Sequence, residues 1–547
     1  MSAERTADSN APMTPTQRWS MLAAILGSAI VFLDGTIVNQ ALPRIGRELP
    51  ATLVGTLEGQ TYVTSGYLAT LAALLVLAGA LADYYGRRRV FAIGLAGFGL
   101  TSALCGAAPT LELLAVFRVL QGAAGALLVP GSIAIITALF DGPARARAFG
   151  IWAAATSATS LLAPFVGGTI VDTVGWRVAF LINIPLIAPA LWATIRHMPE
   201  TKDESASGRF DWLGAVVAVL AVGGISFGTI RGSEKQWHDP LAFAAIGIGV
   251  VALVAFPFLM ARRRDPLVPL ALFRIRRFAT INLATLLIYA ALYANIGFQA
   301  IFLQGILGYT ATASGAVGLP IGVLLTVCSA RVGALAGRLG PRRFLTAGPL
   351  LMAAGLLWLA RIPPDSAPWK ALISDPSTLV PPPSTLVDVL PAMLLFGVGI
   401  SLVVAPLTST LMSSVPTRNA GLASAINNAI SRVGQPIVAA VIFIVVSGTF
   451  YATLAERVAG IDPASAEIRR TVQPLNPPPA GTSPALALAA REASTDAYHL
   501  ASLVSAALLV AGAAANYVGL REERPAGRER ATGEAATGAP TTDSVPG

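Results

Sequence analysis

Long apolar runs recur along the whole chain and are separated by short polar connections. A run of about 20 apolar residues is long enough to cross the ~30 Å hydrocarbon core of a bilayer as a helix. The runs predict about fourteen such helices. Their expected limits are 19–42, 60–82, 90–108, 111–139, 147–171, 178–196, 212–230, 241–261, 279–304, 314–332, 344–361, 389–412, 421–447 and 499–519.

The composition agrees with a membrane location for most of the chain. Apolar residues make up 54% of the 547 residues and charged residues only 12%, and the mean hydropathy is +0.67. A soluble domain carries about 25% charged residues. Because the runs are long and continuous, they favour helices over an outer-membrane barrel. The sequence therefore predicts an all-α polytopic membrane protein.

The sequence lacks the patterns of several kinds of enzyme site. It contains no H-E-x-x-H zinc pattern, no C-x-x-C pair, and no lysine that follows a glycine as in a phosphate-binding loop. We therefore expect no catalytic residue, no metal site and no cofactor, and a protein that is not an enzyme. The residues concerned are His197, His238 and His499; Cys105 and Cys328; and Lys202, Lys235 and Lys370.

The positive charges are distributed unevenly between the two sets of connections. With the N-terminus inside, the inner connections hold 18 Lys and Arg residues, and the short outer connections hold 7. Inner loops of membrane proteins carry the excess of positive charge. We therefore expect a multi-pass protein of the cytoplasmic membrane with both termini in the cytosol. The net charge of +9 then indicates anionic lipid as a partner rather than nucleic acid.

The predicted helices and the polar stretches divide the chain into five segments. Residues 1–18 form a cytosolic tail, and 19–196 form an N-terminal half of six helices. Residues 197–277 form a linker with two extra helices and a basic cytosolic loop. Residues 278–519 form a C-terminal half of six helices with an external loop at 448–498. The Gly-, Pro- and charge-rich residues 520–547 are expected to be a disordered cytosolic tail.

An internal repeat supports the division into halves. The twelve residues that begin at Gly79 share seven identities with the twelve that begin at Gly333, which lie 254 positions later. Both copies contain G-x₆-G-x-R-R, and both lie between the second and third helix of a half. Two related halves that rock about a central site are a common design of secondary transporters.

Four motifs resemble those of the major facilitator superfamily, in particular its fourteen-span drug:proton antiporter branch. They are the loop from Gly79 to Arg89, the stretch Leu33 to Pro43, Arg118 to Gly122, and Gly175 to Pro185. The resemblance covers nearly all of residues 19–519. It implies the major facilitator fold, with two six-helix halves and two inserted helices. It also implies proton-driven multidrug efflux and antibiotic resistance.

The fifth span departs from that resemblance in part. It has Thr159 and Ala163 where the branch has glycines, whereas Gly150, Pro164, Gly167 and Gly168 fit the branch. Small residues at every fourth position of this span, together with Gly122 of the fourth span, predict a seam of close helix packing. Ordinary packing is one interpretation of this seam, and a pliable region around Pro164 is the other.

Two charges lie deep inside the predicted spans. On the rise of an α-helix, Asp34 is about 22 Å into the membrane from the inner face, which is about 8 Å below the outer face, and Arg118 is about 10 Å below the outer face. The two side chains are therefore placed to pair or to compete. An intramembrane carboxyl is expensive and indicates proton coupling, although a structural aspartate bonded to a neighbouring helix is the alternative. For Arg118, capping of backbone carbonyls is the alternative. Arg432 is a third candidate if its span begins near Asn419.

The loop between the second and third spans predicts a conformational latch. Gly79, Asp83, Gly86, Arg87, Arg88 and Arg89 form this loop, and Asp83 is expected to stabilise one of two access states through charge and helix dipole. A solvated charged turn is the alternative.

The expected function is proton-coupled efflux of hydrophobic drugs or secondary metabolites by alternating access. A cationic substrate is expected, because Asp34 is the one acidic residue placed well inside a span. Scattered aromatic residues are candidates to line the cavity through cation–π contacts, namely Tyr62, Tyr67, Tyr289, Tyr293, Phe298 and Phe302. The alternative is an exporter or flippase of a lipid, amino acid or other metabolite. The proton gradient would supply the energy, protons and lipids would be the other partners, and a monomer is expected to suffice.

Overall fold

The computed structural model describes residues 13–202, 210–264, 266–416 and 420–520. Within those ranges the chain is helical and contains no β-strand. The tail beyond residue 520 and most of the N-terminal tail, both expected from the sequence, lie outside the described residues. Thirteen segments are long and apolar enough to cross a membrane. The fourteenth helix, Pro341–Leu359, has 19 residues and carries two arginines near its start.

The fourteen predicted spans correspond to fourteen helical segments, four of which are broken or preceded by a short turn. The helices are α1 Pro15–Glu48, α2 Thr56–Tyr85, α3 Arg87–Ala107, α4 Leu111–Ala126 with α5 Leu128–Leu139, α6 Gly142–Thr173, α7 Trp176–Leu181 with α8 Asn183–His197, α9 Trp212–Glu234, α10 Pro240–Arg262, α11 Arg276–Gly305, α12 Ala311–Ala316 with α13 Leu319–Leu339, α14 Pro341–Leu359, α15 Leu390–Ser413 preceded by η3 Thr385–Val389, α16 Ala420–Arg457 and α18 Pro484–Gly519. Three short elements complete the order: η1 Leu270–Arg274, η2 Pro376–Leu379 and α17 Ala466–Thr471.

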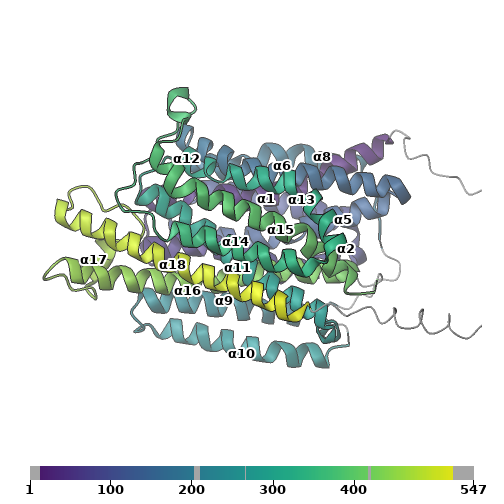
Figure 1. Cartoon of the computed structure of the whole chain (residues 1–547). Helices are drawn as coiled ribbons and strands as arrows, with labels where there is room; N and C mark the ends of the chain where they lie inside the picture. Colours follow the sequence, from purple (N-terminus) through teal and green to yellow (C-terminus); the bar gives the residue numbers. More distant parts are fainter. Residues whose placement is uncertain (1–12, 203–209, 265, 417–419, 521–547) are drawn as a thin grey trace, which may run out of the picture.

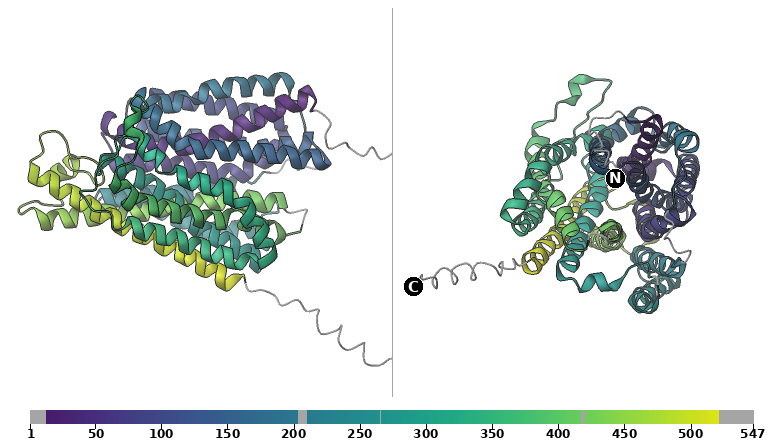
Figure 2. Two further views of the ribbon diagram at one scale, coloured as in Figure 1. Left: turned by 45° about the horizontal axis from the view of Figure 1, so that its top comes forward. Right: turned by 90° about the vertical axis from the view of Figure 1, so that its right-hand side faces the viewer.

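The helices form two bundles that lie side by side. Figure 2 shows α1–α8 in purple and blue on one side and α11–α18 in green and yellow on the other. Helices α9 and α10 pack against each other, and α9 also contacts α2 of the first bundle and α16 of the second. The hydroxyl of Ser226 on α9 donates to the carbonyl of Pro436 on α16 at 2.9 Å. The extra pair of helices is therefore attached to both bundles through α9.

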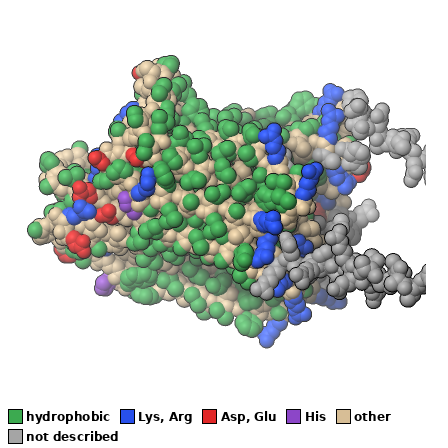
Figure 3. Space-filling model, in the orientation of Figure 1, with side chains coloured by type: hydrophobic (Ala, Val, Ile, Leu, Met, Phe, Trp, Pro, Cys, Tyr) green, Lys and Arg blue, Asp and Glu red, His purple; other side chains and the backbone are tan. Residues whose placement is uncertain are grey.

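The two ends of the molecule differ in charge, and a belt of apolar side chains lies between them (Figure 3). One end, which we call the basic end, carries clustered arginines and is where the described chain begins and finishes. The other, which we call the loop end, carries the long connections 360–384 and 458–483. Exposed leucines, valines and isoleucines over the belt match a surface that faces lipid.

The external loop expected at 448–498 is shorter in the structure. Helix α16 continues to Arg457 and α18 begins at Pro484, so only 458–483 remain between them. Two ion pairs connect the extended ends of α16 and α18: Arg457 pairs with Glu492 and, at 3.0 Å, with Asp496. These helix ends project beyond the apolar belt at the loop end (Figure 1).

The repeat found in the sequence has the same geometry in both bundles. Gly86 joins α2 to α3 with a φ of +111°, and Gly340 joins α13 to α14 with a φ of +84°. Only glycine adopts such angles without strain. The two glycines of the repeat therefore make the same turn at the basic end.

The bundles are joined at the loop end. The carboxylate of Asp172 on α6 accepts hydrogen bonds from the backbone N–H groups of Ala311 and Thr312 at 3.1 and 2.7 Å, at the start of α12. Gln304 on α11 donates to the carbonyl of Gln40 on α1 at 3.1 Å. Among the described residues, no hydrogen bond joins α1–α8 to α11–α18 at the basic end. The structure is therefore closed at the loop end.

A loop segment, residues 472–476, is buried in this closed end. Leu475 has no exposed surface and a φ of +59°, an uncommon angle for a residue with a side chain. Asn476 and Gln60 on α2 exchange two amide hydrogen bonds of 3.2 Å. Segment 472–476 therefore connects the second bundle to the first.

Candidate functional site

Asp34 and Arg118 form an ion pair in the centre of the first bundle. Asp34 lies near the middle of α1 and has no exposed surface, and Arg118, seven residues into α4, is 1% exposed. Arg118 Nη1 donates to Asp34 Oδ2. The equal depths expected from helix geometry therefore bring the two charges into direct contact.

Three polar side chains complete the surroundings of the pair. Gln121 Nε2 and Asn183 Nδ2 each donate to Asp34 Oδ1 at 3.1 Å. Both amides also donate to Ser102 Oγ, at 3.3 and 3.0 Å. Both carboxylate oxygens of Asp34 are thus engaged, by groups from α4 and α8. The buried Oδ1 of Asn183 makes no hydrogen bond within the described structure, so the network holds one spare acceptor.

Arg118 has further partners besides the carboxylate. Its Nε donates to the carbonyl of Val63 at 3.1 Å, and its Nη1 donates to Gln121 Oε1 at 2.7 Å. Its Cζ lies 4.0 Å from the centre of the Tyr67 ring. A desolvated cation over an aromatic ring gains about 2 kcal/mol. The guanidinium is therefore supported in part even when its carboxylate partner is neutral.

A buried ion pair usually contributes little net stability compared with an apolar pair of similar size. Removing two charges from water costs about as much as their attraction returns, whereas removal of one partner costs about 3–5 kcal/mol. Such a pair responds strongly to protonation, because a proton on Asp34 leaves Arg118 without its counter-charge. The arrangement can therefore couple proton binding to a change of structure.

A polar cavity of about 230 Å³ lies between the bundles, on the side of the basic end. Its walls come from α1, α11, α15 and α16. Arg432 on α16 is 6% exposed and lies 12 residues after Ala420, about 18 Å along the helix. The deep position expected for Arg432 if its span began near Asn419 is the one observed. The cavity is lined by Phe32, Tyr289, Tyr293, Leu407, Thr408, Leu411, Met412, Ser424, Asn427, Asn428, Ser431 and Arg432.

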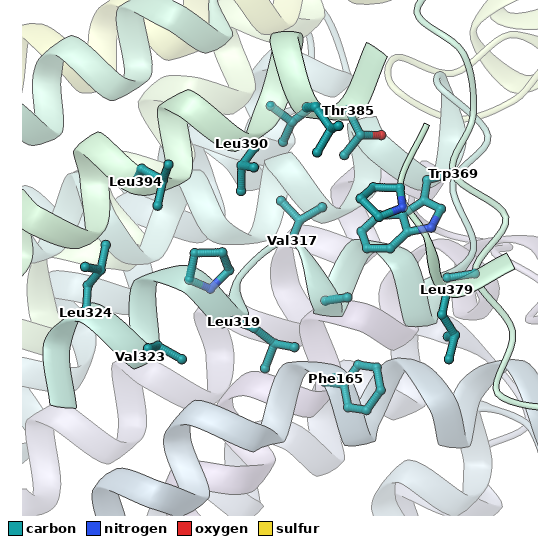
Figure 4. A pocket seen from close by; sticks show the side chains of 16 residues that line it. Phe165, Val317, Leu319, Val323, Leu324, Trp369, Leu379, Thr385, Leu390 and Leu394 are labelled. Carbon is teal, nitrogen blue, oxygen red and sulfur yellow. The ribbon is translucent and has the colours of Figure 1, made fainter. Parts of the chain in front are cut away.

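A larger apolar cavity of about 580 Å³ lies nearer the loop end (Figure 4). Phe165 reaches it from α6, and Leu390 and Leu394 reach it from α15. Trp369 donates its indole N–H to the carbonyl of Thr378 at 2.9 Å, so it presents only its ring. Among the described residues, no ionisable side chain lines this cavity. It can accept apolar groups but cannot distinguish charges.

The loop of the predicted latch is tied to its own bundle. Arg87 Nη2 pairs with Asp83 Oδ1 at 2.9 Å. Glu200, just after α8, accepts the backbone N–H of Arg88 at 3.1 Å and lies 3.6 Å from Arg89 Nε. A side chain at Gly86 would collide with the Glu200 carboxylate. The Asp83 latch stays a prediction, and the structure adds Glu200 to it.

The glycines of the predicted seam differ in how closely they pack. A Cβ at Gly168 would collide with the backbone of Ala311, and one at Gly122 would collide with the backbone of Tyr67. A Cβ at Gly167 would approach Ile37 to 2.8 Å, whereas one at Gly150 would meet nothing within 4 Å. The carbonyl of Pro164 in turn lies against Gly315 of α12. Gly168 and Pro164 therefore bring the two bundles together, whereas Gly150 makes no close contact.

Other aromatic residues proposed from the sequence are divided among several places. Tyr289 and Tyr293 line the polar cavity. Tyr62 bonds to Glu58 at 3.0 Å, at the loop end, and Phe302 stacks on Tyr498 with ring centres 4.0 Å apart. Only the first pair therefore lies where a molecule held between the bundles would touch it.

Sequence reasoning did not single out Asn183, Ser102 or Glu200. Asn183 lies within the motif Gly175 to Pro185, at the point where α7 gives way to α8. That motif was the one available signal. Within the described residues, no group of His, Cys, Asp and Glu is arranged to hold a metal ion.

Comparison with known proteins identifies the family. The sequence pattern of the Major Facilitator Superfamily matches residues 24–439. This chain belongs to the Major Facilitator Superfamily. It is similar to the multidrug resistance protein Stp of Mycobacterium tuberculosis, with 33% identity over 443 residues that cover 81% of this chain and 78% of that protein. The multidrug efflux pump LfrA of Mycolicibacterium smegmatis is 30% identical over 515 residues, which cover 93% and 97% of the two chains.

Two further likenesses agree with this family. The puromycin resistance protein of Streptomyces alboniger is 32% identical over 457 residues, which cover 82% of this chain and 86% of that protein. Among solved structures, a bacterial homologue of the human lysosomal transporter Spinster superposes with a TM-score of 0.61 at 18% identity, over 93% of this chain and 98% of that one. The major facilitator fold expected from the sequence is thus confirmed.

Proposed function

We propose that this protein exports hydrophobic drugs or secondary metabolites across the cytoplasmic membrane, in exchange for protons. Curated relatives that carry names of multidrug efflux and antibiotic resistance support export. The observation that supports proton coupling is the buried Asp34–Arg118 pair, which has no structural need to be ionic. The proton gradient is the energy source, and the chain transports rather than catalyses.

The basic end faces the cytosol in this proposal. Arginine clusters mark the cytosolic side of membrane proteins, and the described chain begins and finishes at that end. The loop end then faces outward. Because the bundles meet at the loop end and the polar cavity lies toward the basic end, the structure corresponds to an inward-open state.

One cycle follows from these contacts. With Asp34 ionised, Arg118 is held in the first bundle and the inward-open cavity receives substrate. Protonation of Asp34 requires an acceptor for the new O–H, and rotation of the Asn183 amide presents its spare oxygen. Arg118 then rests on Tyr67 and Val63. The proton is taken up while the cavity is open to the outside and is released inside.

Reconstituted vesicles test this function. Purified protein is inserted into vesicles that contain a trapped pH dye, and cationic, neutral and anionic drugs are added under an imposed pH gradient. Drug addition is expected to release protons from wild-type vesicles and not from protein-free vesicles. A panel in which no drug moves protons or accumulates against its gradient would refute the proposal.

The alternative is an exporter or flippase of a lipid, amino acid or other metabolite on the same fold. The apolar cavity of Figure 4 is the observation that favours a lipid, because the residues described as lining it are uncharged. The same vesicles, prepared with fluorescent lipid in one leaflet, measure this activity. Lipid movement without any drug response would favour the alternative.

A further inference from the structure

The described wall of the polar cavity between the bundles carries a positive charge and no acidic residue. The helices that form it are α1, α11, α15 and α16. Of their acidic residues, Glu48 and Glu456 lie at the loop end, and only Asp34 lies at central depth. The net charge that a molecule in the cavity meets therefore depends on whether the Asp34 carboxylate can interact with it.

Asp34 is not available, because its carboxylate is fully engaged. Arg118 binds one oxygen, and Gln121 and Asn183 bind the other. The side chain has no exposed surface, and it is neutralised by a guanidinium in the same bundle. A cation in the cavity would thus gain no counter-charge from Asp34.

Arg432 is the charge that the cavity presents. It is 94% buried, since only 6% of it is exposed, and among the described residues no carboxylate pairs with it. Its Nη1 donates to the carbonyl and to the side-chain Oδ1 of Asn428 on its own helix, at 3.1 and 3.4 Å, and its Nε and Nη2 make no hydrogen bond within the described structure. A buried, unpaired guanidinium attracts an anion, because an ion pair offsets the cost of its desolvation.

The two side-chain amides of the cavity wall already donate hydrogen bonds elsewhere. Asn427 Nδ2 donates to Asn282 and Thr285 at 3.1 and 2.9 Å, and Asn428 Nδ2 donates to the carbonyl of Ser424 at 3.0 Å. Arg432 is thus the main source of free N–H groups.

Three aromatic rings also line the cavity. Tyr289 and Tyr293 have ring centres 5.9 Å apart, and neither hydroxyl makes a hydrogen bond within the described structure. Phe32 faces them from α1. A cavity of about 230 Å³ is smaller than a site that encloses a whole drug, so it holds one end of a larger molecule.

We propose that this cavity binds the acidic end of an aromatic substrate, such as a carboxylate, sulfonate or phenolate, on Arg432. The inference rests on the proposed export function and replaces the lipophilic cation expected from the sequence. It has an energetic consequence. When one anion leaves in exchange for one entering proton, the inside gains two positive charges in net terms. An inside-negative membrane potential therefore drives this exchange, in addition to the pH gradient.

Binding of two probes that are matched in shape and opposite in charge tests the proposal. Tritiated naphthalenesulfonate and naphthylmethylammonium share a fused-ring body and differ in charge, and both are measured on the full chain in nanodiscs without a gradient. We expect the sulfonate to bind at least about tenfold more tightly, because one hydrogen bond to a charged group usually contributes a binding free energy of about that size. Arg432→Gln should remove that preference, and Arg432→Lys should keep most of it.

A control variant and a transport measurement complete the test. Arg457→Gln makes the same change on the same helix, but at the loop end, and should leave both affinities unchanged. In vesicles, an inside-negative potential alone should drive export of the sulfonate. Preference for the ammonium probe, binding of neither probe, or equal effects of Arg432→Gln and Arg457→Gln would overturn the proposal. Proton-coupled export of the ammonium would do so while leaving the proposed function intact.

Discussion

Replacement of Asp34 by asparagine should abolish proton-driven accumulation while leaving the protein folded. Asparagine keeps the size of the side chain and can still bond to Gln121 and Asn183, but it cannot carry a proton on and off. Arg118 then lies buried without its counter-charge, which alone costs about 3–5 kcal/mol. Its bonds to Val63 and Gln121 and the Tyr67 ring offset part of this cost.

The size of the transport effect follows from the driving force. One pH unit is worth about 1.4 kcal/mol per proton, which sustains a roughly tenfold concentration ratio of substrate when one proton is exchanged. Without a titrating group at position 34, that ratio should fall to about one. Downhill exchange of substrate should continue, since the cavity residues on α11 and α16 are unchanged.

Vesicles with a pH step of one unit measure both effects. Asp141→Asn is the matched control, because Asp141 is 92% exposed and pairs only with Arg145 on the surface. The control should keep the tenfold ratio. If Asp34→Asn vesicles accumulated substrate to the level of the control at equal protein content, Asp34 would have no part in coupling.

Three further predictions use the same vesicles or single-cysteine labelling. Arg118→Ala should uncouple transport, and combined with Asp34→Asn it should have a less than additive effect on thermal stability, because the two side chains touch; strict additivity would contradict the contact. Gly168→Val should prevent close contact at the loop end and raise the labelling of cysteines there, whereas Gly150→Val on the same helix should not; equal labelling would show that closure does not depend on Gly168. Asp83→Asn should slow turnover by changing the balance of the two access states while substrate affinity stays constant, and unaltered labelling at both ends would reject the latch.

The membrane helices were predictable because their pattern is imposed by lipid. An apolar run of sufficient length identifies each span, and fourteen helices lie at the predicted places. The ends of α16 and α18 were not predictable in the same way. Beyond the bilayer a helix needs no apolar run, and the pairing of Arg457 with Glu492 and Asp496 joins residues about 35 to 39 positions apart.

The site was predictable only where one residue is chemically unusual at its depth. A buried aspartate and a buried arginine are conspicuous inside apolar runs, so Asp34 and Arg118 were found. Asn183 and Ser102 are uncharged and come from other helices, so only the folded arrangement shows that they meet at Asp34. How closely a glycine packs against a neighbouring helix depends on the folded structure. The sequence alone therefore cannot distinguish Gly168, which packs closely, from Gly150, which does not.

The exposure of segment 472–476 reports the state of the protein, because this segment is buried only while the two bundles meet at the loop end. In the present state Leu475 and Asn476 are covered, and the amide pair with Gln60 holds them against the first bundle. Separation of the bundles at the loop end must break that pair and release a backbone held at an unfavourable angle. With the loop end facing outward, as we propose, an antibody fragment raised against this short peptide is expected to bind intact cells only while the two bundles are apart at that end. Binding of such a fragment would hold the protein in that state.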